Sequence, residues 1–282
     1  MQEFFDFFLF GYIQRALISG ISIAIMCSLI GLFLVLRKQS LFGDAISHMA
    51  FGGIAIGTYL NIYPFWTAII FSASSALVIN KIRYYTKLNS DSMVAVLLSF
   101  GLGIGVTLIS ISDGFSVDLF SFLFGSILLV SYEDVLMTVG MAIIVTSIIG
   151  LFFKKLIYVT FDEDQAKISG LHVEQLDYLF IVLVAVTVIV SMKLVGILLI
   201  SSLIVIPNIA SLMLNQGFKR TLFISIIISA CSVFFGIILS YYFNTAPSGM
   251  IVLLSVGIFI AVIISKYFYQ NINIFSNTSR VK

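Results

Sequence analysis

Long apolar runs separated by short polar connections dominate this sequence, and they allow few folds. A helix needs about 20 mainly apolar residues to cross the hydrocarbon core of a bilayer. Only 10% of the 282 residues are charged, whereas soluble domains carry about 25%. The sequence therefore predicts an all-α polytopic membrane protein with about nine transmembrane helices. We expect them at residues 12–36, 44–61, 64–82, 92–112, 134–153, 175–192, 194–214, 220–243 and 248–268.

One further apolar segment, residues 119–130 (LFSFLFGSILLV), is too short to cross a bilayer. We expect it to form a re-entrant or interfacial helix rather than a tenth span. The spans are predicted to form a single transmembrane domain over residues 1–269. A polar cytoplasmic tail is expected to follow at residues 270–282.

The distribution of lysine and arginine predicts the orientation of the chain. Cytoplasmic loops of membrane proteins carry an excess of these residues. If the N-terminus lies outside, every basic residue except Arg15 and Lys193 falls at the inner face. A tenth span at 119–130 would destroy this segregation for all later loops. We therefore expect the N-terminus outside and the C-terminus inside, with Lys193 snorkelling to the outer surface.

Two ionisable residues, Asp44 and His48, lie in the apolar stretch SLFGDAISHMAFGGIAIG. Their spacing places both side chains on one face of a helix. An ionisable group at the centre of a membrane helix costs roughly 2.5–3.5 kcal/mol, so such groups are functional candidates. A carboxylate beside an imidazole suits a divalent transition metal. The alternative is structural: Asp44 caps the helix that follows Gly43, and His48 is a buried, hydrogen-bonded histidine.

The longest inner connection contains an acidic cluster, Asp162–Asp164, followed by a short helix-like stretch, Gln165–Ile168. Acidic residues at its start suit the positive end of a helix dipole, and Gly170 follows as a helix stop. The segment is either a solvated connector or a surface helix that docks a cytoplasmic partner. The chain has no phosphate-binding loop of the GxxxxGK[ST] type, so ATP-driven work would require a separate subunit.

Carboxylates also lie near the predicted outer face. Asp113 and Asp118 are either ordinary surface residues or a funnel that delivers cations to the membrane site. Glu133 and Asp134 are expected to mark the start of the span 134–153, with Ser131 as its helix cap.

A proline inside the span 194–214, Pro207, removes a backbone hydrogen bond and predicts a kink. The kink is either a packing feature or a hinge that lines a pathway. Polar neighbours in this span can bond freed carbonyl groups or face a cavity. These neighbours are Ser201, Ser202 and Asn208.

Two glycine pairs with three residues between their members predict close helix packing. They are Gly53 with Gly57, and Gly101 with Gly105. Each pair presents a smooth helix face that lets another backbone approach. Because the first pair lies just beyond His48, it can bring another helix close to the candidate metal site.

Four segments follow one another along the chain: LVLRKQSLFGDAISHMAFGGIAIG, VDLFSFLFGSILLVSYEDV, SMKLVGILLISSLIVIP and TAPSGMIVLL. Together they resemble the membrane permeases of ABC-type zinc/manganese uptake systems, and the middle two look most like the zinc-uptake branch. The chain departs from the family pattern at two places. Asn208 and Ile209 follow Pro207 where small alanine-rich residues are usual, and the span 92–112 lacks the histidine that some zinc members carry.

The resemblance implies a permease without enzymatic activity, forming a homodimer in the bacterial cytoplasmic (inner) membrane. A cytoplasmic ATP-binding subunit would dock below, and an extracytoplasmic metal-binding protein would deliver the ion from above. Asp44 and His48 match the family's SxxGDAxSH motif and would lie on the translocation path. The segment Phe161–Leu171 would form the coupling helix that meets the ATPase. Its expected contact residues are Phe161, Asp162, Asp164, Ala166 and Gly170.

The expected cargo is a divalent metal, with zinc favoured over manganese and no permanently bound cofactor. A manganese or iron permease of the same type is the nearest alternative, because carboxylate and imidazole suit all three metals. A secondary metal carrier that works without an ATPase is the other alternative. The chain contains neither HExxH nor GxSxG, which argues against an intramembrane hydrolase, and no nucleic-acid partner is expected.

Overall fold

The computed structural model describes residues 9–86, 90–111, 125, 127 and 130–278. Within these residues the regular secondary structure is helical, with no strand. The α-helices are α2 (Gly11–Leu36), α3 (Phe42–Tyr59), α4 (Pro64–Thr86), α5 (Ser90–Ile111), α7 (Tyr132–Phe161), α8 (Glu163–Ile168), α9 (Val173–Val195), α10 (Ile197–Leu212), α11 (Phe218–Phe243) and α12 (Pro247–Thr278). The all-α prediction is confirmed for this part of the chain.

Seven of the described helices are long and apolar enough to cross a membrane, which makes the chain a multi-pass membrane protein. They are α2, α4, α5, α7, α9, α11 and α12. Helices α3 and α10 occupy two further predicted spans but are less suited to spanning alone. Asp44, His48 and four glycines lower the hydropathy of α3, and α10 has only 16 residues. The number of nine spans and the orientation therefore remain predictions.

Helices α7 and α12 extend furthest beyond their predicted ends. Helix α7 continues from residue 153 to Phe161, and α12 continues from residue 268 to Thr278. Neither extension contains glycine or proline, so nothing in the local sequence stops the helix. Most of the segment expected as a polar tail is therefore helical, while the domain boundary at residue 269 remains a prediction.

The break between the sixth and seventh predicted spans falls at Gly196 rather than at residue 193. Gly196 separates α9 from α10 with φ 81° and ψ 161°, a conformation that glycine adopts without a steric penalty. Two other predictions concern residues outside the described part of the chain. These are Asp113 and Asp118, together with most of the segment 119–130.

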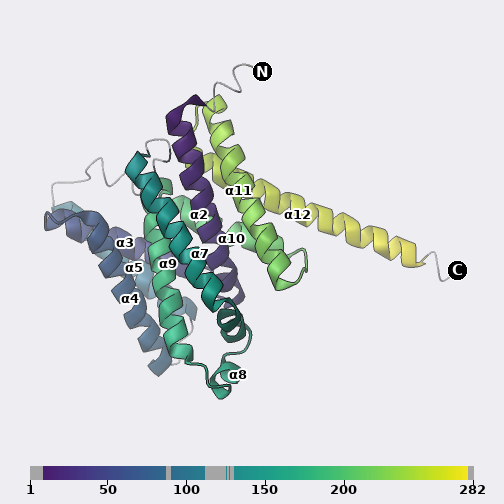
Figure 1. The fold of residues 1–282 in the computed structure, drawn as a ribbon, viewed down its shortest axis with the longest axis horizontal. Coiled ribbons are helices and arrows are strands. Elements are labelled where there is room, and N and C mark those ends of the chain that lie inside the picture. The colour runs from purple at the N-terminus through teal and green to yellow at the C-terminus, as the bar shows by residue number, and fades with distance from the viewer. Residues whose placement is uncertain (1–8, 87–89, 112–124, 126, 128–129, 279–282) are drawn as a thin grey trace.

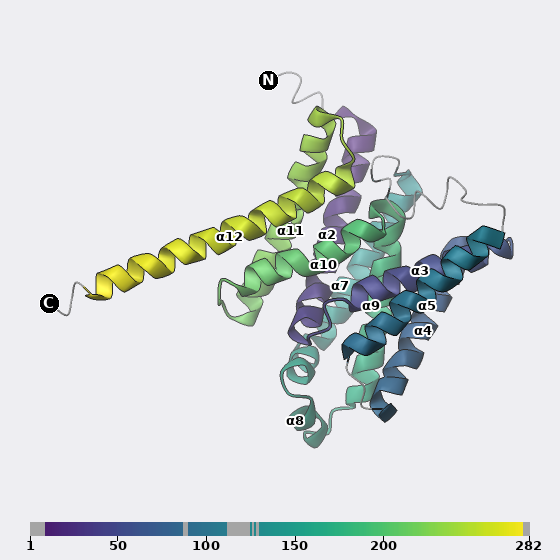
Figure 2. The same cartoon turned by 180° about the vertical axis from the view of Figure 1, so that it is seen from behind.

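Helices α2 and α9 lie at the centre of the bundle (Figures 1 and 2). In each of them 72% of the apolar stretch is buried, against 11% in α12. Helices α3 and α4 pack beside α9 with α5 against α3, whereas α10 and α11 pack beside α2. Helix α12 contacts α10 and α11 and then extends away from the bundle (Figure 1).

Glycines bring α3 almost into backbone contact with its neighbours. A Cβ atom at Gly101 of α5 would lie 2.5 Å from the carbonyl oxygen of His48 and 2.7 Å from the amide nitrogen of Met49. A Cβ atom at Gly53 would lie 2.8 Å from the Cα of Ala68 in α4. The predicted packing role of these glycines is confirmed, and α5 lies directly against the main chain of His48.

We predict that Gly101→Ala destabilises the protein and that Gly103→Ala, on the same helix, does not. The new Cβ at residue 101 must displace the backbone of α3, which costs at least the roughly 1–3 kcal/mol typical of overpacking. Gly103 has no such neighbour within 4 Å, and alanine favours a helix. Thermal unfolding of the two purified variants measures the difference. Equal melting temperatures would show that α3 and α5 do not pack this closely.

Candidate functional site

Asp44 and His48 lie in the first two turns of α3 and share one face of the helix, as predicted. The Oδ1 atom of Asp44 is 3.7 Å from the Nε2 atom of His48. The side chains are 26% exposed for Asp44 and 18% exposed for His48. The carboxylate and the imidazole are therefore shielded, yet still accessible, and close enough to bind one small cation together.

A third polar group, the hydroxyl of Ser201, reaches this pair from α10. Ser201 Oγ donates a hydrogen bond of 2.8 Å to Asp44 Oδ1. The interpretation of Asp44 as a helix cap is wrong, because the N-cap of α3 is Leu41, which makes no side-chain cap bond. Asp44 still benefits from the helix dipole in the first turn, but its carboxylate faces another helix.

The imidazole of His48 is held so that one nitrogen faces the carboxylate. Its Nδ1 atom is buried and has no hydrogen-bond partner among the described residues. Nε2 is the atom that lies near Asp44. Within the described part of the chain, no third His, Cys, Asp or Glu joins them in a cluster that could hold a metal. One subunit therefore offers a carboxylate, an imidazole and a hydroxyl, a set suited to transient binding rather than to a closed structural site.

Helix α10 continues through Pro207, and its polar residues have separate roles. Asn208 Nδ2 donates to the carbonyl oxygen of Ile204 at 2.7 Å, and Ser225 Oγ of α11 donates to Asn208 Oδ1 at 2.7 Å. Ser202 Oγ donates within its own helix to Leu199. Ser201 is the member of the predicted polar set that contacts the candidate site, and no feature of the local sequence distinguishes it from Ser202.

The predicted coupling segment contains the short helix α8, which lies between α7 and α9 (Figure 1). Asp162 is its N-cap and accepts a hydrogen bond of 2.9 Å from the amide of Gln165. Ala166 is fully buried, whereas Phe161 and Ile168 are strongly exposed. Gly170 has a positive φ of 80° just after the helix. The segment therefore has one anchored face and one face that presents apolar side chains to the surroundings.

An ion pair also links two residues of α8 on its exposed surface. Lys167 Nζ is 2.7 Å from Glu163 Oε1, and this carboxylate raises the pKa of Lys167 through the hydrogen bond between them. Both side chains are exposed, so solvent screens the interaction and its contribution to stability is small.

A buried arginine, Arg37, ties together the three helix ends around α8. Its Nη1 atom is 2.7 Å from Asp177 Oδ1 of α9, and its Nε atom donates to Thr160 Oγ1 of α7 at 3.0 Å. The guanidinium carbon lies 4.7 Å from the centre of the Phe180 ring, a cation–π distance. Only 12% of the Arg37 side chain and 6% of the Asp177 side chain are exposed. The pattern of basic residues predicts only the membrane face on which Arg37 lies, and no local pattern indicates this contact.

The opposite end of α7 agrees with the predicted cap and adds an ion pair. Ser131 is the N-cap, and it forms a reciprocal capping box with Asp134. Lys193 Nζ of α9 bonds to Asp134 Oδ1. Lys193 was expected simply to snorkel to water, whereas the structure pairs it with a carboxylate from another helix.

Comparisons with known proteins place this arrangement in context. A model of the ABC 3 transport family matches residues 9–266. The chain is 34% identical to a probable metal transport system membrane protein of Treponema pallidum, over 90% of this chain and 95% of that protein. It is 34% identical to a manganese import system permease protein of Streptococcus gordonii, over 89% and 90% of the two chains. A high-affinity zinc uptake system membrane protein of Haemophilus influenzae is 28% identical, over 89% and 97%.

A solved structure has the same fold. A chain of PsaBC from Streptococcus pneumoniae, in complex with Fab, superposes with a TM-score of 0.82 and 33% identity over 93% of this chain and 94% of that chain. The expected assignment to the zinc branch is not supported, because the relatives include manganese permeases of higher identity than the zinc protein.

We predict that Asp177→Asn destabilises the protein far more than Lys167→Ala. The first change leaves the buried Arg37 guanidinium without its counter-charge, which typically costs about 3–5 kcal/mol. The second removes an exposed pair worth at most about 1 kcal/mol. The midpoints of thermal unfolding provide the measurement. If the two variants unfold at the same temperature, the Arg37 contact does not hold the helix ends together.

Proposed function

The chain belongs to the ABC 3 transport family and is a metal transport permease, and on this premise we propose that it is the membrane subunit of an ATP-driven importer of divalent metal. The observation that carries the proposal is the state of Asp44. Within helices α3, α7 and α9 three carboxylates are largely shielded: Asp44, Asp134 and Asp177. Asp134 pairs with a lysine and Asp177 with an arginine, whereas among the described residues Asp44 contacts only an imidazole and a hydroxyl. A metal ion is the cation that would complete this site.

We infer that manganese is the cargo. Carboxylate oxygens are hard ligands that suit manganese, and the described site has one imidazole and no thiolate. The similarity to a manganese import permease supports the same choice. Zinc is the second candidate, because the imidazole of His48 suits it and because a zinc uptake membrane protein is also related.

The proposed mechanism is alternating access in a homodimer. An extracytoplasmic metal-binding protein releases its ion at the outer face, near Asp113 and Asp118. Asp44 and His48 bind the ion transiently, and Ser201 orients the carboxylate. A transport site must release its ion as well as bind it, which a small ligand set in each subunit favours.

The proposed energy source is a separate cytoplasmic ATPase that contacts α8. The exposed Phe161 and Ile168 provide an apolar docking face, and Asp162 and Asp164 add charge. Arg37 would pass a displacement of α8 to α2, because it joins the helix ends on either side of α8. In this arrangement α8 is cytoplasmic, the chain is N-out and C-in with nine spans, and the host membrane is the bacterial cytoplasmic membrane.

We predict that Asp44→Ala and His48→Ala reduce manganese uptake to the level of cells without the protein, because each removes a direct ligand. Ser201→Ala removes only the hydrogen bond to the carboxylate and should weaken uptake at limiting metal by roughly 10–100-fold. Ser202→Ala is the matched control, because Ser202 bonds within α10, and should behave as wild type. The measurement is the accumulation of radioactive manganese in cells. Competition by excess zinc tests zinc as the alternative cargo.

All these variants should still co-purify with the ATPase, since the substitutions lie away from α8. Normal metal accumulation in Asp44→Ala or His48→Ala would exclude the site. If excess zinc abolishes manganese uptake, whereas excess manganese does not reduce zinc uptake, zinc is the cargo.

We predict that charge reversal at Asp162 and Asp164 weakens association with the ATPase. Asp162→Asn removes the charge of this residue but keeps the helix cap, because asparagine caps a helix as well as aspartate does. Gly170→Val should act in the same direction, since a β-branched residue is strained at positive φ. Co-purification of the tagged ATPase is the measurement. Glu133→Lys, an exposed charge reversal at the opposite end of α7, is the control, and equal recovery of all variants would place the docking site elsewhere.

A further inference from the structure

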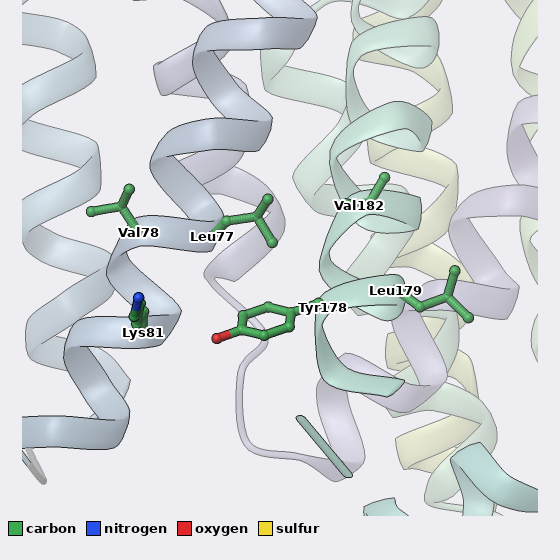
Figure 3. Close-up of a pocket in the computed structure, with 6 residues that line it drawn as sticks. All are labelled: Leu77, Val78, Lys81, Tyr178, Leu179 and Val182. Carbon is green, nitrogen blue, oxygen red and sulfur yellow. The ribbon is translucent and has the colours of Figure 1, made fainter. Parts of the chain in front are cut away.

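A surface groove lies between α4 and α9. Its volume is about 540 Å³, within the roughly 300–1,000 Å³ usual for ligand sites. Both helices are long and apolar enough to span a membrane. The groove is lined by Leu77, Val78, Lys81, Tyr178, Leu179 and Val182 (Figure 3).

The polar groups of the groove gather at one end. Lys81 lies near the C-terminal end of α4, and Tyr178 lies near the start of α9, the end that follows α8. In Figure 3 the Tyr178 ring extends from α9 towards α4, with its hydroxyl on the side of Lys81. Leu77, Val78 and Val182 lie further along the groove. The lining is almost entirely apolar, and the two residues with polar groups lie at one end of the groove, where α4 ends and α9 begins.

We propose that this groove binds one anionic phospholipid. Its phosphate contacts Lys81 and Tyr178, and an acyl chain lies against Leu77 and Val182. Basic residues between transmembrane helices bind anionic head groups, and tyrosine is enriched at the level of the head groups. The lipid belongs to the leaflet on the α8 side, so the groove places it beside the helices that surround α8.

The charge at the groove favours a lipid over a second copy of the chain. Lys81 is exposed, and none of the ion pairs among the described residues includes it. A second copy of the chain would have to place a carboxylate opposite Lys81, because burying an ammonium group without a counter-charge is costly. A phosphate supplies the counter-charge, and its acyl chain covers the exposed Val78 and Val182.

Native mass spectrometry of the full-length permease tests the proposal, using phosphatidylglycerol and phosphatidylcholine with the same acyl chains. We expect one phosphatidylglycerol per chain, bound about fivefold more tightly than phosphatidylcholine, the factor expected for one lysine. Lys81→Ala should abolish this preference. Val182→Trp fills the groove and should remove both lipids.

Two matched variants serve as controls. Lys154→Ala removes an exposed lysine of α7, and Ile144→Trp enlarges an exposed apolar residue of α7; both should bind lipid as the wild type does. Retained preference in Lys81→Ala, or retained lipid in Val182→Trp, would overturn the proposal. An adduct with the mass of a free fatty acid would also overturn it. The same holds for a Val182→Trp variant that no longer forms the dimer but binds lipid unchanged.

Discussion

The cost of removing charge from water determines how this bundle is held together. Arg37 and Asp177 neutralise each other where α2, α7 and α9 meet, and Asp134 and Lys193 do so at the other end of α7. Such pairs stabilise the assembled helices chiefly because breaking one leaves a buried charge without a counter-charge. Asp44 follows a different rule. Its side chain is 26% exposed, against 16% for Asp134 and 6% for Asp177, and its partners among the described residues carry no fixed positive charge. The bundle thus closes two ionic contacts permanently, and in the proposed function the third carboxylate binds a mobile cation.

A series of helix contacts through α2 and α10 connects the helices that flank α8 to the Asp44 site. Arg37, at the end of α2, bonds to both helices that flank α8. Further along α2, a Cβ atom at Gly31 would lie 2.1 Å from the carbonyl oxygen of Ile204 in α10. Helix α10 carries Ser201, which bonds to Asp44. Close-packed helices move as units rather than deforming continuously. A shift of α2 relative to α10 would therefore alter the position of the hydroxyl at Asp44.

The features that sequence analysis predicted correctly are those that local pattern determines. Apolar runs of sufficient length located the helices, and the spacing of Asp44 and His48 placed them on one face. Ser131 and Asp134 match the geometry of a helix cap within a few residues. The partners that were missed lie far apart in the chain: Ser201 is 157 residues from Asp44, and Asp177 is 140 residues from Arg37. Such pairs depend on how the helices pack, and no local periodicity encodes them. The expected preference for zinc over manganese is not supported, because the same ligands suit several ions.

The low hydropathy of α3 affects how the protein enters the membrane during synthesis. An aspartate costs about 2.5–3.5 kcal/mol at the centre of an inserting helix, and α3 also carries His48 and four glycines. Asp44 lies in the first turn of α3 rather than at its centre, which reduces this cost but does not remove it. The same glycines that allow α4 and α5 to approach α3 contribute almost nothing to its own partitioning into lipid. We therefore expect α3 to enter the bilayer together with its neighbours, as part of a helical hairpin, rather than as an independent segment.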